Sequence, residues 1–447
     1  MLRALLTALL VLSACSSGAQ TAPSASVPPS AESPVPAPRS PQNVVLFIAD
    51  GFGPTSATLG AAASRAMGRE FVLDTGLIGS VETSATDSRV TDSAAGATAY
   101  ACGLKTYNGA IGMDAARTPC RTVLEEAEAR GMATGLVATS RLTHATPASF
   151  ASHVESRAEE AEIAAQMVVS GVDVMFGGGR SFFTGRTDGR DLARELTEAG
   201  ATVALDGAAF DDLASTPAVA LLADSHLAYE VDRDATDEPS LAEMTSRALD
   251  LLAEAGGGDG FFLMIEASRI DHAAHGNDPV GHLGDILAYD EALAAALAWA
   301  EAQGSTLIVA TADHETGGMA LGRDGIYAWD PQPLLDATMS LEAMGRAIQG
   351  GADPVETIRA GVAMDLDEGV AEAIRGAVAS GDLSTLQPLV VDLLSKPAGI
   401  GWTTGGHTAV DVGLYAWGPG ADAFRGQMGN DEVGRRLFAA LGLTPSE

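Results

Sequence analysis

Residues 43–50 read NVVLFIAD, an apolar run that reaches no charged side chain until Asp50. A short run without polar alternation is typical of a strand buried on both faces, as in a parallel sheet. The same pattern recurs later in the chain, in ATGLVAT at 133–139, VDVMFGGG at 172–179, FFLMIEAS at 261–268, TLIVATADH at 306–314 and VGLYAWGP at 412–419. We interpret all of these runs as strands.

Amphipathic stretches of helical length separate these strands. They include TVLEEAEARG at 122–131, EEAEIAAQMVVSG at 159–171, LARELTEAG at 192–200 and GDILAYDEALAAALAWAEAQG at 284–304, and each ends in a glycine suited to a helix C-terminus. Such alternation predicts an α/β fold with a central, mainly parallel sheet and helices on both faces. Ligands of these folds bind beyond the carboxyl ends of the strands.

The alternation stops between about residues 321 and 397, where the pattern is almost entirely helical. We interpret this stretch as a helical insertion over one edge of the active face. The catalytic domain as a whole is predicted to run from residue 43 to residue 447.

The N-terminus has the pattern of an export signal. Residues 1–15 contain an arginine, a short apolar stretch and the ending Leu-Ser-Ala-Cys, which resembles a bacterial lipoprotein cleavage box with Cys15 as the lipidated residue. Ordinary signal cleavage nearby is the alternative. Residues 16–42 are rich in Pro, Ser and Ala, which is typical of a disordered tether. We therefore expect a periplasmic or cell-surface protein that touches the membrane only through this lipid.

Export also decides what is expected of the two remaining cysteines. In an oxidising compartment Cys102 and Cys120 are expected to form a disulfide, with two separate buried thiols as the alternative.

The formal net charge of the chain is −33. Such a surface repels the phosphate backbone, which argues against nucleic acid binding as a main function.

Acidic side chains follow several predicted strands. Asp50, Glu266 and Asp313 each lie at the end of an apolar run, so they are expected at one rim of the sheet. Asp271 and His275 are four residues apart, which places them on one face of a helical turn. Carboxylates gathered in this way repel each other unless cations lie between them. The pattern therefore indicates a metal site.

Taken together, these segments resemble the alkaline phosphatase family of metal-dependent phosphomonoesterases. The resemblance extends from residue 43 to about residue 443 and rests on motifs in family order: VLFIADGFGP at 45–54, VTDSAAGATAYACGLKTYNGAIG at 90–112, THATPASFASHVESR at 143–157, IEASRIDHAAHGND at 265–278 with TADHETGG at 311–318, and WTTGGHT at 402–408. It implies hydrolysis of small phosphate monoesters to an alcohol and inorganic phosphate through a phosphoserine.

The resemblance also implies two zinc ions and one magnesium ion. Their ligands would be Asp271, His275 and His407 for the first zinc, Asp50, Asp313 and His314 for the second, and Asp50, Thr146 and Glu266 for the magnesium. Mixed carboxylate and imidazole donors suit zinc, whereas oxygen donors suit magnesium.

The other site residues follow from the same motifs. Ser93 would be the nucleophile, Arg157 would bind the phosphate, and Asp92 would orient Arg157. His144, near the magnesium, and His272, near the phosphate, stand where one well-known bacterial branch has Asp and Lys. This difference leaves the identity of the third ion open.

Some alternatives stay open at this point. His153, His226 and His282 match no ligand position, so we interpret them as structural or surface residues. Phosphodiesterases, sulfatases and phosphomutases share the fold, and a phosphate-binding surface protein is a non-enzymatic alternative. The sequence also leaves open whether the chain forms a homodimer.

Overall fold

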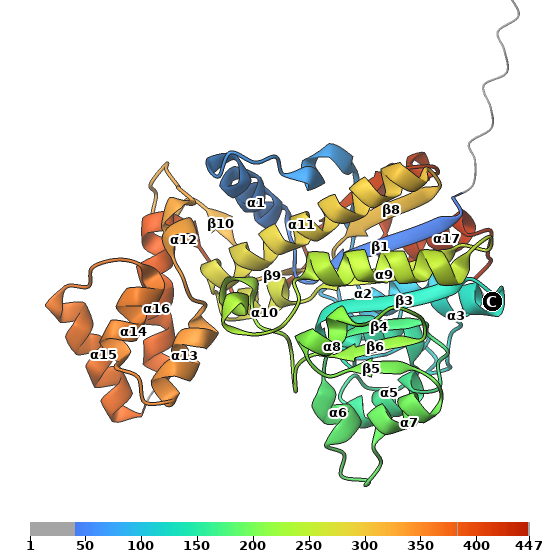
Figure 1. Ribbon diagram of the computed structural model, residues 1–447. Helices are drawn as coiled ribbons and strands as arrows, with labels where there is room; N and C mark the ends of the chain where they lie inside the picture. Colours follow the sequence, from blue (N-terminus) through green and yellow to red (C-terminus); the bar gives the residue numbers. More distant parts are fainter. Residues whose placement is uncertain (1–40, 382, 446–447) are drawn as a thin grey trace, which may run out of the picture. The chain divides into compact units, whose positions relative to one another are not determined.

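The computed structural model describes residues 41–445 except residue 382 (Figure 1). The predicted signal sequence with Cys15, and tether residues 16–40, lie outside this range. The central sheet has ten described strands in the order β14-β2-β13-β8-β1-β7-β3-β4-β6-β5. Their bounds are β1 (Asn43–Ala49), β2 (Leu77–Glu82), β3 (Ala133–Arg141), β4 (Val174–Gly178), β5 (Thr202–Ala204), β6 (Ala218–Leu221), β7 (Phe261–Ala267), β8 (Thr306–Thr311), β13 (Val412–Trp417) and β14 (Gly426–Gly429).

The sheet is mainly parallel, as predicted. β1 lies between β7 and β8, pairs in parallel with both, and is buried along its whole length. β13 is the exception, because it runs antiparallel to both β2 and β8. The predicted strand at 412–419 therefore exists, but its apolar character does not reflect parallel pairing.

Helices cover both faces of the sheet, and two neighbouring residues of β7 make this visible. The ring of Phe262 packs on Phe150 with centroids 6.0 Å apart, whereas Phe261 packs on Trp299 at 5.7 Å. Successive strand residues point to opposite faces. Phe150 lies in α4 (Ala145–Ala151), and Trp299 lies in α11 (Pro279–Gln303), which runs beside α9 (Leu241–Gly256) (Figure 1). The predicted α/β fold with helices on both faces is confirmed.

The remaining helices of the sheet region are α1 (Pro54–Ala66), α2 (Ser93–Cys102), α3 (Val123–Ala129), α5 (Glu160–Met167), α6 (Arg180–Thr184), α7 (Leu192–Glu198), α8 (Gly207–Asp211), α10 (Arg269–His275) and α17 (Asn430–Ala440). Short 3₁₀ helices occur at η1 (Val72–Gly76), η2 (Glu230–Ala235) and η3 (Ala421–Phe424). Among the described residues, no helix combines the length and the apolar character that are needed to cross a membrane.

The stretch predicted as an insertion is helical. It contains α12 (Gln332–Asp336), α13 (Leu341–Gln349), α14 (Pro354–Val362), α15 (Glu368–Ser380) and α16 (Leu383–Ala398) (Figure 1). The antiparallel pair β10 (Ala320–Leu321) and β11 (Ile400–Gly401) closes its base. A separate apolar cluster joins these helices to Leu59 of α1 and Leu283 of α11. The insertion therefore has a small core of its own that rests on the sheet region.

Candidate metal and phosphate site

Helix α2 places Ser93 at the centre of the candidate site. Asp92 is the N-cap of this helix, and its carboxylate accepts a hydrogen bond from the backbone N–H of Ala95 at 3.0 Å. Ser93 is buried, and its Oγ lies 3.2 Å from Nε2 of His314. A Cβ on Gly96 would lie only 3.0 Å from Cβ of Asp313. The small residues of α2 therefore allow its first turn to sit against the end of β8.

Ser93 lies beside a first cluster of metal-capable groups, formed by Asp50, Asp313 and His314. All three are completely buried, and Nε2 of His314 lies 3.5 Å from Oδ1 of Asp50 and 3.3 Å from Oδ2 of Asp313. Each follows the end of β1 or β8, which are neighbours in the sheet. The prediction that strand ends bring these acids together is correct.

Several buried oxygens of this cluster have no hydrogen-bond partner. They are both carboxylate oxygens of Asp50 and Oδ2 of Asp313. Burial, followed by the nearby Asp313, raises the pKa of Asp50 well above its usual range. Burial and then the charge of Asp271 raise the pKa of Asp313 to about 6. An unpartnered buried carboxylate is costly, so these oxygens fit a bound cation.

A second cluster contains Asp271, His275 and His407. Asp271 and His275 lie one turn apart on α10, with Oδ2 of Asp271 3.3 Å from Nε2 of His275. His407 begins β12 (His407–Thr408), which pairs with β9 (Glu315–Thr316) directly after His314. Nε2 of His407 lies 3.2 Å from Nε2 of His275. The three donors therefore converge on one point.

Each histidine of this cluster is also hydrogen-bonded through Nδ1 to a backbone carbonyl oxygen. Nδ1 of His275 lies 2.7 Å from the carbonyl oxygen of Gly405, and Nδ1 of His407 lies 2.9 Å from that of Thr91. A carbonyl oxygen accepts only, so each Nδ1 carries the proton. Each Nε2 then offers its lone pair to the cluster, which is the tautomer that a metal requires.

The third cluster joins Asp50 to Glu266 and His144. Thr146 lies two residues after His144, in the first turn of α4. Oε1 of Glu266, Oγ1 of Thr146 and Nδ1 of His144 are all buried without a hydrogen-bond partner. Burial raises the pKa of Glu266 to about 7. The two oxygens also fit a cation, whereas Nε2 of His144 accepts a hydrogen bond from Arg157, so Nδ1 of this neutral ring carries the proton.

Arg157 connects the third cluster to α2. Its Nη1 donates to Oδ2 of Asp92 at 3.1 Å, and its Nη2 donates to Nε2 of His144 at 3.1 Å. Asp92 also accepts from the backbone N–H of Gly109 at 3.1 Å. The guanidinium is therefore fixed at two nitrogens, as expected for an arginine that Asp92 orients.

His272 lies in a group of three histidine rings. Its centroid is 4.3 Å from that of His226 and 5.3 Å from that of His144. The interpretation of His226 as a structural or surface residue did not include its place in this group. Nε2 of His226 lies 2.5 Å from Nη1 of Arg141, and burial with Arg141 lowers its pKa to about 3. The ring is therefore neutral beside His272.

The remaining residues named from the sequence lie outside this cluster. His153 contacts Glu125 at 2.9 Å, and the buried His282 contacts Ser56 at 2.9 Å, as expected for structural residues. Cys102 and Cys120 form a disulfide with their Cα atoms 6.0 Å apart. Cys102 is the last residue of α2, so the bond connects the end of this helix to the loop before α3.

Comparisons with known proteins agree with this geometry. Residues 41–443 match the family model described as alkaline phosphatase. Alkaline phosphatase 3 of Bacillus subtilis is 39% identical, over 90% of this chain and 89% of that protein. The crystal structure of Thermus thermophilus alkaline phosphatase superimposes with a TM-score of 0.83 at 34% identity, covering 91% of this chain and 92% of that one.

A third relative is a solved structure that is described with a bound metal ion. A variant of alkaline phosphatase from the Antarctic bacterium TAB5, described as having Mg bound in its M3 site, superimposes with a TM-score of 0.69. It is 30% identical, and the alignment covers 91% of this chain and 99% of that one. The family match over nearly the whole described chain, together with the clustered metal-capable side chains around Ser93, shows that the chain belongs to the alkaline phosphatase family.

Proposed function

We propose that this phosphomonoesterase acts through a phosphoserine formed on Ser93, with two zinc ions and one magnesium ion held by the three clusters. The observation that carries the proposal is the set of unpartnered buried oxygens beside Ser93. Clusters of metal-capable side chains are common in proteins. Here two of the three clusters share Asp50, and the cluster of Asp50, Asp313 and His314 borders a buried serine at the N-terminus of a helix.

The donor sets support this choice of metals. The two clusters that contain His275 with His407, and His314 with two carboxylates, match the mixed donors that zinc prefers. Glu266 and Thr146 offer oxygens that suit magnesium. When bound, these cations would neutralise the carboxylates, lower the pKa of the Ser93 hydroxyl and polarise the phosphate oxygens.

The side chains themselves define the course of the reaction. The backbone N–H groups at the start of α2 and the positive end of its dipole favour an anion at Ser93. Arg157 keeps N–H groups beyond those bonded to Asp92 and His144, and its planar fork suits two phosphate oxygens. Ser93 Oγ bonds to phosphorus as the bond to the alcohol oxygen breaks. Water then attacks the phosphoserine, which restores the serine and releases inorganic phosphate.

We also propose that the chain is exported and anchored by lipid on Cys15, because residues 1–15 have the pattern of a lipoprotein signal. The membrane would then be reached only through this lipid. The strongly acidic composition fits a role outside nucleic acid binding.

The Ser93→Ala substitution tests the chemical proposal. We expect loss of turnover of an aryl phosphate, while metal analysis of the purified variant still finds the zinc and magnesium of the wild-type protein. Retained turnover would exclude Ser93 as the nucleophile. Loss of the metals together with turnover would instead show that Ser93 supports the metal site.

The wild-type protein tests the alternative of a phosphodiesterase. In this proposal the third metal takes the space beside Ser93 that a second ester group would need. We therefore expect faster hydrolysis of an aryl phosphate than of a bis-aryl phosphate, and a faster diester rate would overturn the assignment to monoesters.

A further inference from the structure

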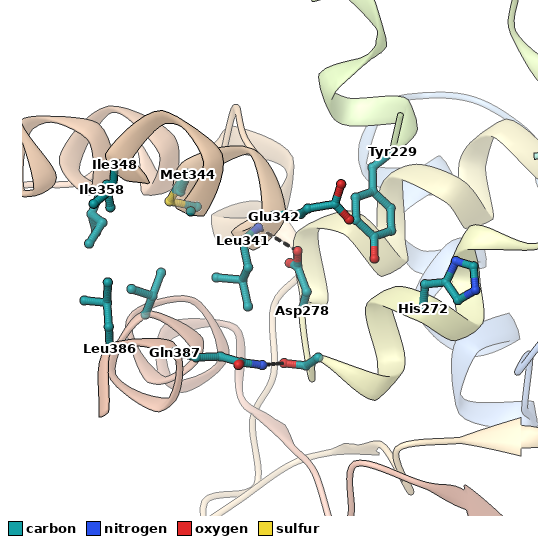
Figure 2. A pocket seen from close by; sticks show the side chains of 13 residues that line it. Tyr229, His272, Asp278, Leu341, Glu342, Met344, Ile348, Ile358, Leu386 and Gln387 are labelled. Carbon is teal, nitrogen blue, oxygen red and sulfur yellow. Dashed lines mark hydrogen bonds between the residues drawn. The ribbon is translucent and has the colours of Figure 1, made fainter. Parts of the chain in front are cut away.

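Arg269 begins α10 and joins this helix to the helical insertion. Its side chain is only 5% exposed, and its guanidinium carbon lies 3.8 Å from the ring centre of Tyr229. Nη2 donates to Oε2 of Glu342, in α13 of the insertion, at 2.6 Å, and Nη1 donates to Nδ1 of His272, in α10, at 3.1 Å. Glu342, Tyr229 and His272 line a cavity of about 290 Å³, and Figure 2 shows the Glu342 carboxylate beside the Tyr229 ring. One guanidinium therefore bonds to a residue of the insertion and to a residue of α10.

The bond to Glu342 does not account for the burial of Arg269. Arg346, one turn further along α13, pairs with the same carboxyl group while its own side chain is 56% exposed. A charged group is seldom buried where a surface position serves as well, because its desolvation is costly. The bond to His272 distinguishes the buried arginine from the exposed one. It also fixes this ring, because an arginine only donates, so Nδ1 of His272 accepts and Nε2 carries the proton.

The ring of His272 is connected to the proposed phosphate-binding arginine through His144. The two rings meet edge to face, with their centroids 5.3 Å apart and an angle of 78° between their planes. Nε2 of His144 accepts from Arg157, which also donates to Asp92, the residue before Ser93. A hydrogen bond weakens steeply when its angle changes. The bond to Arg157 therefore depends on the angle at which the neighbouring rings hold His144.

The third ring of this group, His226, is held in the same way. Arg141 donates to Nε2 of His226 and binds Glu160 through two of its nitrogens, at 2.7 and 2.9 Å. The ring of His226 lies 5.5 Å from that of His144, at 82° to it. Each of the three histidines thus accepts from an arginine that is itself bound to a carboxylate. His144 packs against two rings that such pairs hold in place.

We propose that Arg269 is a positioning residue for the proposed phosphate site. By holding His272, it keeps the ring of His144 at the angle at which this ring accepts from Arg157. The inference rests on the proposed function, in which Arg157 binds the phosphate. Arg269 acts through these side chains and does not touch the phosphate itself. Because Glu342 belongs to α13, the insertion then contributes to phosphate affinity although it supplies no metal ligand.

Arg269→Lys tests the proposal by keeping the charge and removing the planar fork. A lysine leaves a cation beside Tyr229 and Glu342, but its single nitrogen cannot repeat the two bonds that Nη1 and Nη2 make in different directions. Calorimetric titration of the metal-loaded protein with inorganic phosphate measures the effect. We expect the dissociation constant to rise about tenfold, as for the loss of one well-aligned hydrogen bond, with the metal content unchanged. Unchanged affinity would overturn the proposal, because the charge alone would then suffice.

Glu342→Gln is a milder test, because Glu342 is partly exposed. Glu356→Gln in α14 is the matched control, since Glu356 is an exposed glutamate of the same insertion that pairs with Arg359. The dissociation constant of phosphate should rise about threefold in Glu342→Gln, as for the loss of a partly exposed ion pair, and stay at the wild-type value in Glu356→Gln. This comparison carries the test if Arg269→Lys loses its metals. Equal affinities in the two glutamine variants would overturn the proposal.

NMR of isotope-labelled histidine rings separates this inference from the proposed function, because it requires no turnover. The signals of His272 are those that disappear in His272→Gln. In the wild-type protein they should show a proton on Nε2 and none on Nδ1, and in Arg269→Lys both tautomers should be present. A wild-type His272 with its proton on Nδ1 would overturn the proposal. Failure of the proposed function would instead appear as a wild-type protein that binds no phosphate while its His272 ring still shows the expected tautomer.

Discussion

Asp285 allows a test of how burial of a carboxyl group makes the stability of the fold depend on pH. It lies in α11, is almost completely buried, and accepts a hydrogen bond from the backbone N–H of Glu230 at 3.2 Å. Burial raises its pKa to about 8, against the opposing effect of Arg269. The folded state therefore holds a proton that the unfolded chain releases near pH 4. Its contribution to stability is complete below pH 4 and is lost as the pH rises through 8.

The magnitude follows from these two pKa values. Between pH 5 and pH 8 the free energy of unfolding should fall by about 4 kcal/mol on account of this one carboxyl group. For a folded region of about 400 residues, this corresponds to about 4 °C in melting temperature. Asp285→Asn keeps an acceptor for Glu230 but never ionises. The melting temperature of the variant should therefore rise by about 4 °C relative to wild type between pH 5 and pH 8.

Calorimetry or dye-monitored melting at pH 5, 6, 7 and 8 measures this difference, with each variant compared with wild type at the same pH and metal content. Asp234→Asn is the control, because the side chain of Asp234 is fully exposed and lacks the burial on which the prediction for Asp285 rests. A constant difference between Asp285→Asn and wild type across this range would refute the reasoning, because it would mean that Asp285 titrates alike in the folded and unfolded chains.

Two further predictions concern the positioning of the catalytic groups. Asp92→Ala removes the acceptor that holds Arg157, so KM for an aryl phosphate should rise about tenfold with a much smaller change in kcat; a fall in kcat alone would contradict the orienting role. Gly96→Ala places a Cβ 3.0 Å from that of Asp313 and should push α2 outward, so kcat should fall about tenfold while circular dichroism stays unchanged. An unchanged kcat would show that α2 can shift without moving Ser93.

The central strands could be predicted from the sequence because they are long and buried. The strands that sequence reasoning missed lack this pattern. β5 has 3 residues, β6 and β14 have 4 each, and Leu77 at the start of β2 is largely exposed. Short or half-exposed strands are held by their neighbours in the sheet, and a single sequence shows no periodicity for them.

The residues of the candidate site also divide into those that a strand pattern predicts and those that it does not. Asp50, Glu266 and Asp313 could be found because they end long strands, and the rule that ligands bind at carboxyl ends applies directly. Arg157 precedes an ordinary polar helix, and only the family motif distinguishes it. His226 lies in the loop after β6, which was not recognised as a strand, so its contact with His272 could not be predicted.

The position of the insertion in the chain keeps its helices apart from the metal ligands. β9 and β12 pair directly beside His314 and His407, and β10 and β11 form the next pair outward along the same two segments. The insertion helices begin and end at this outer pair. The outer pair therefore separates these helices from the inner pair, of which His407 is a part and which His314 directly precedes.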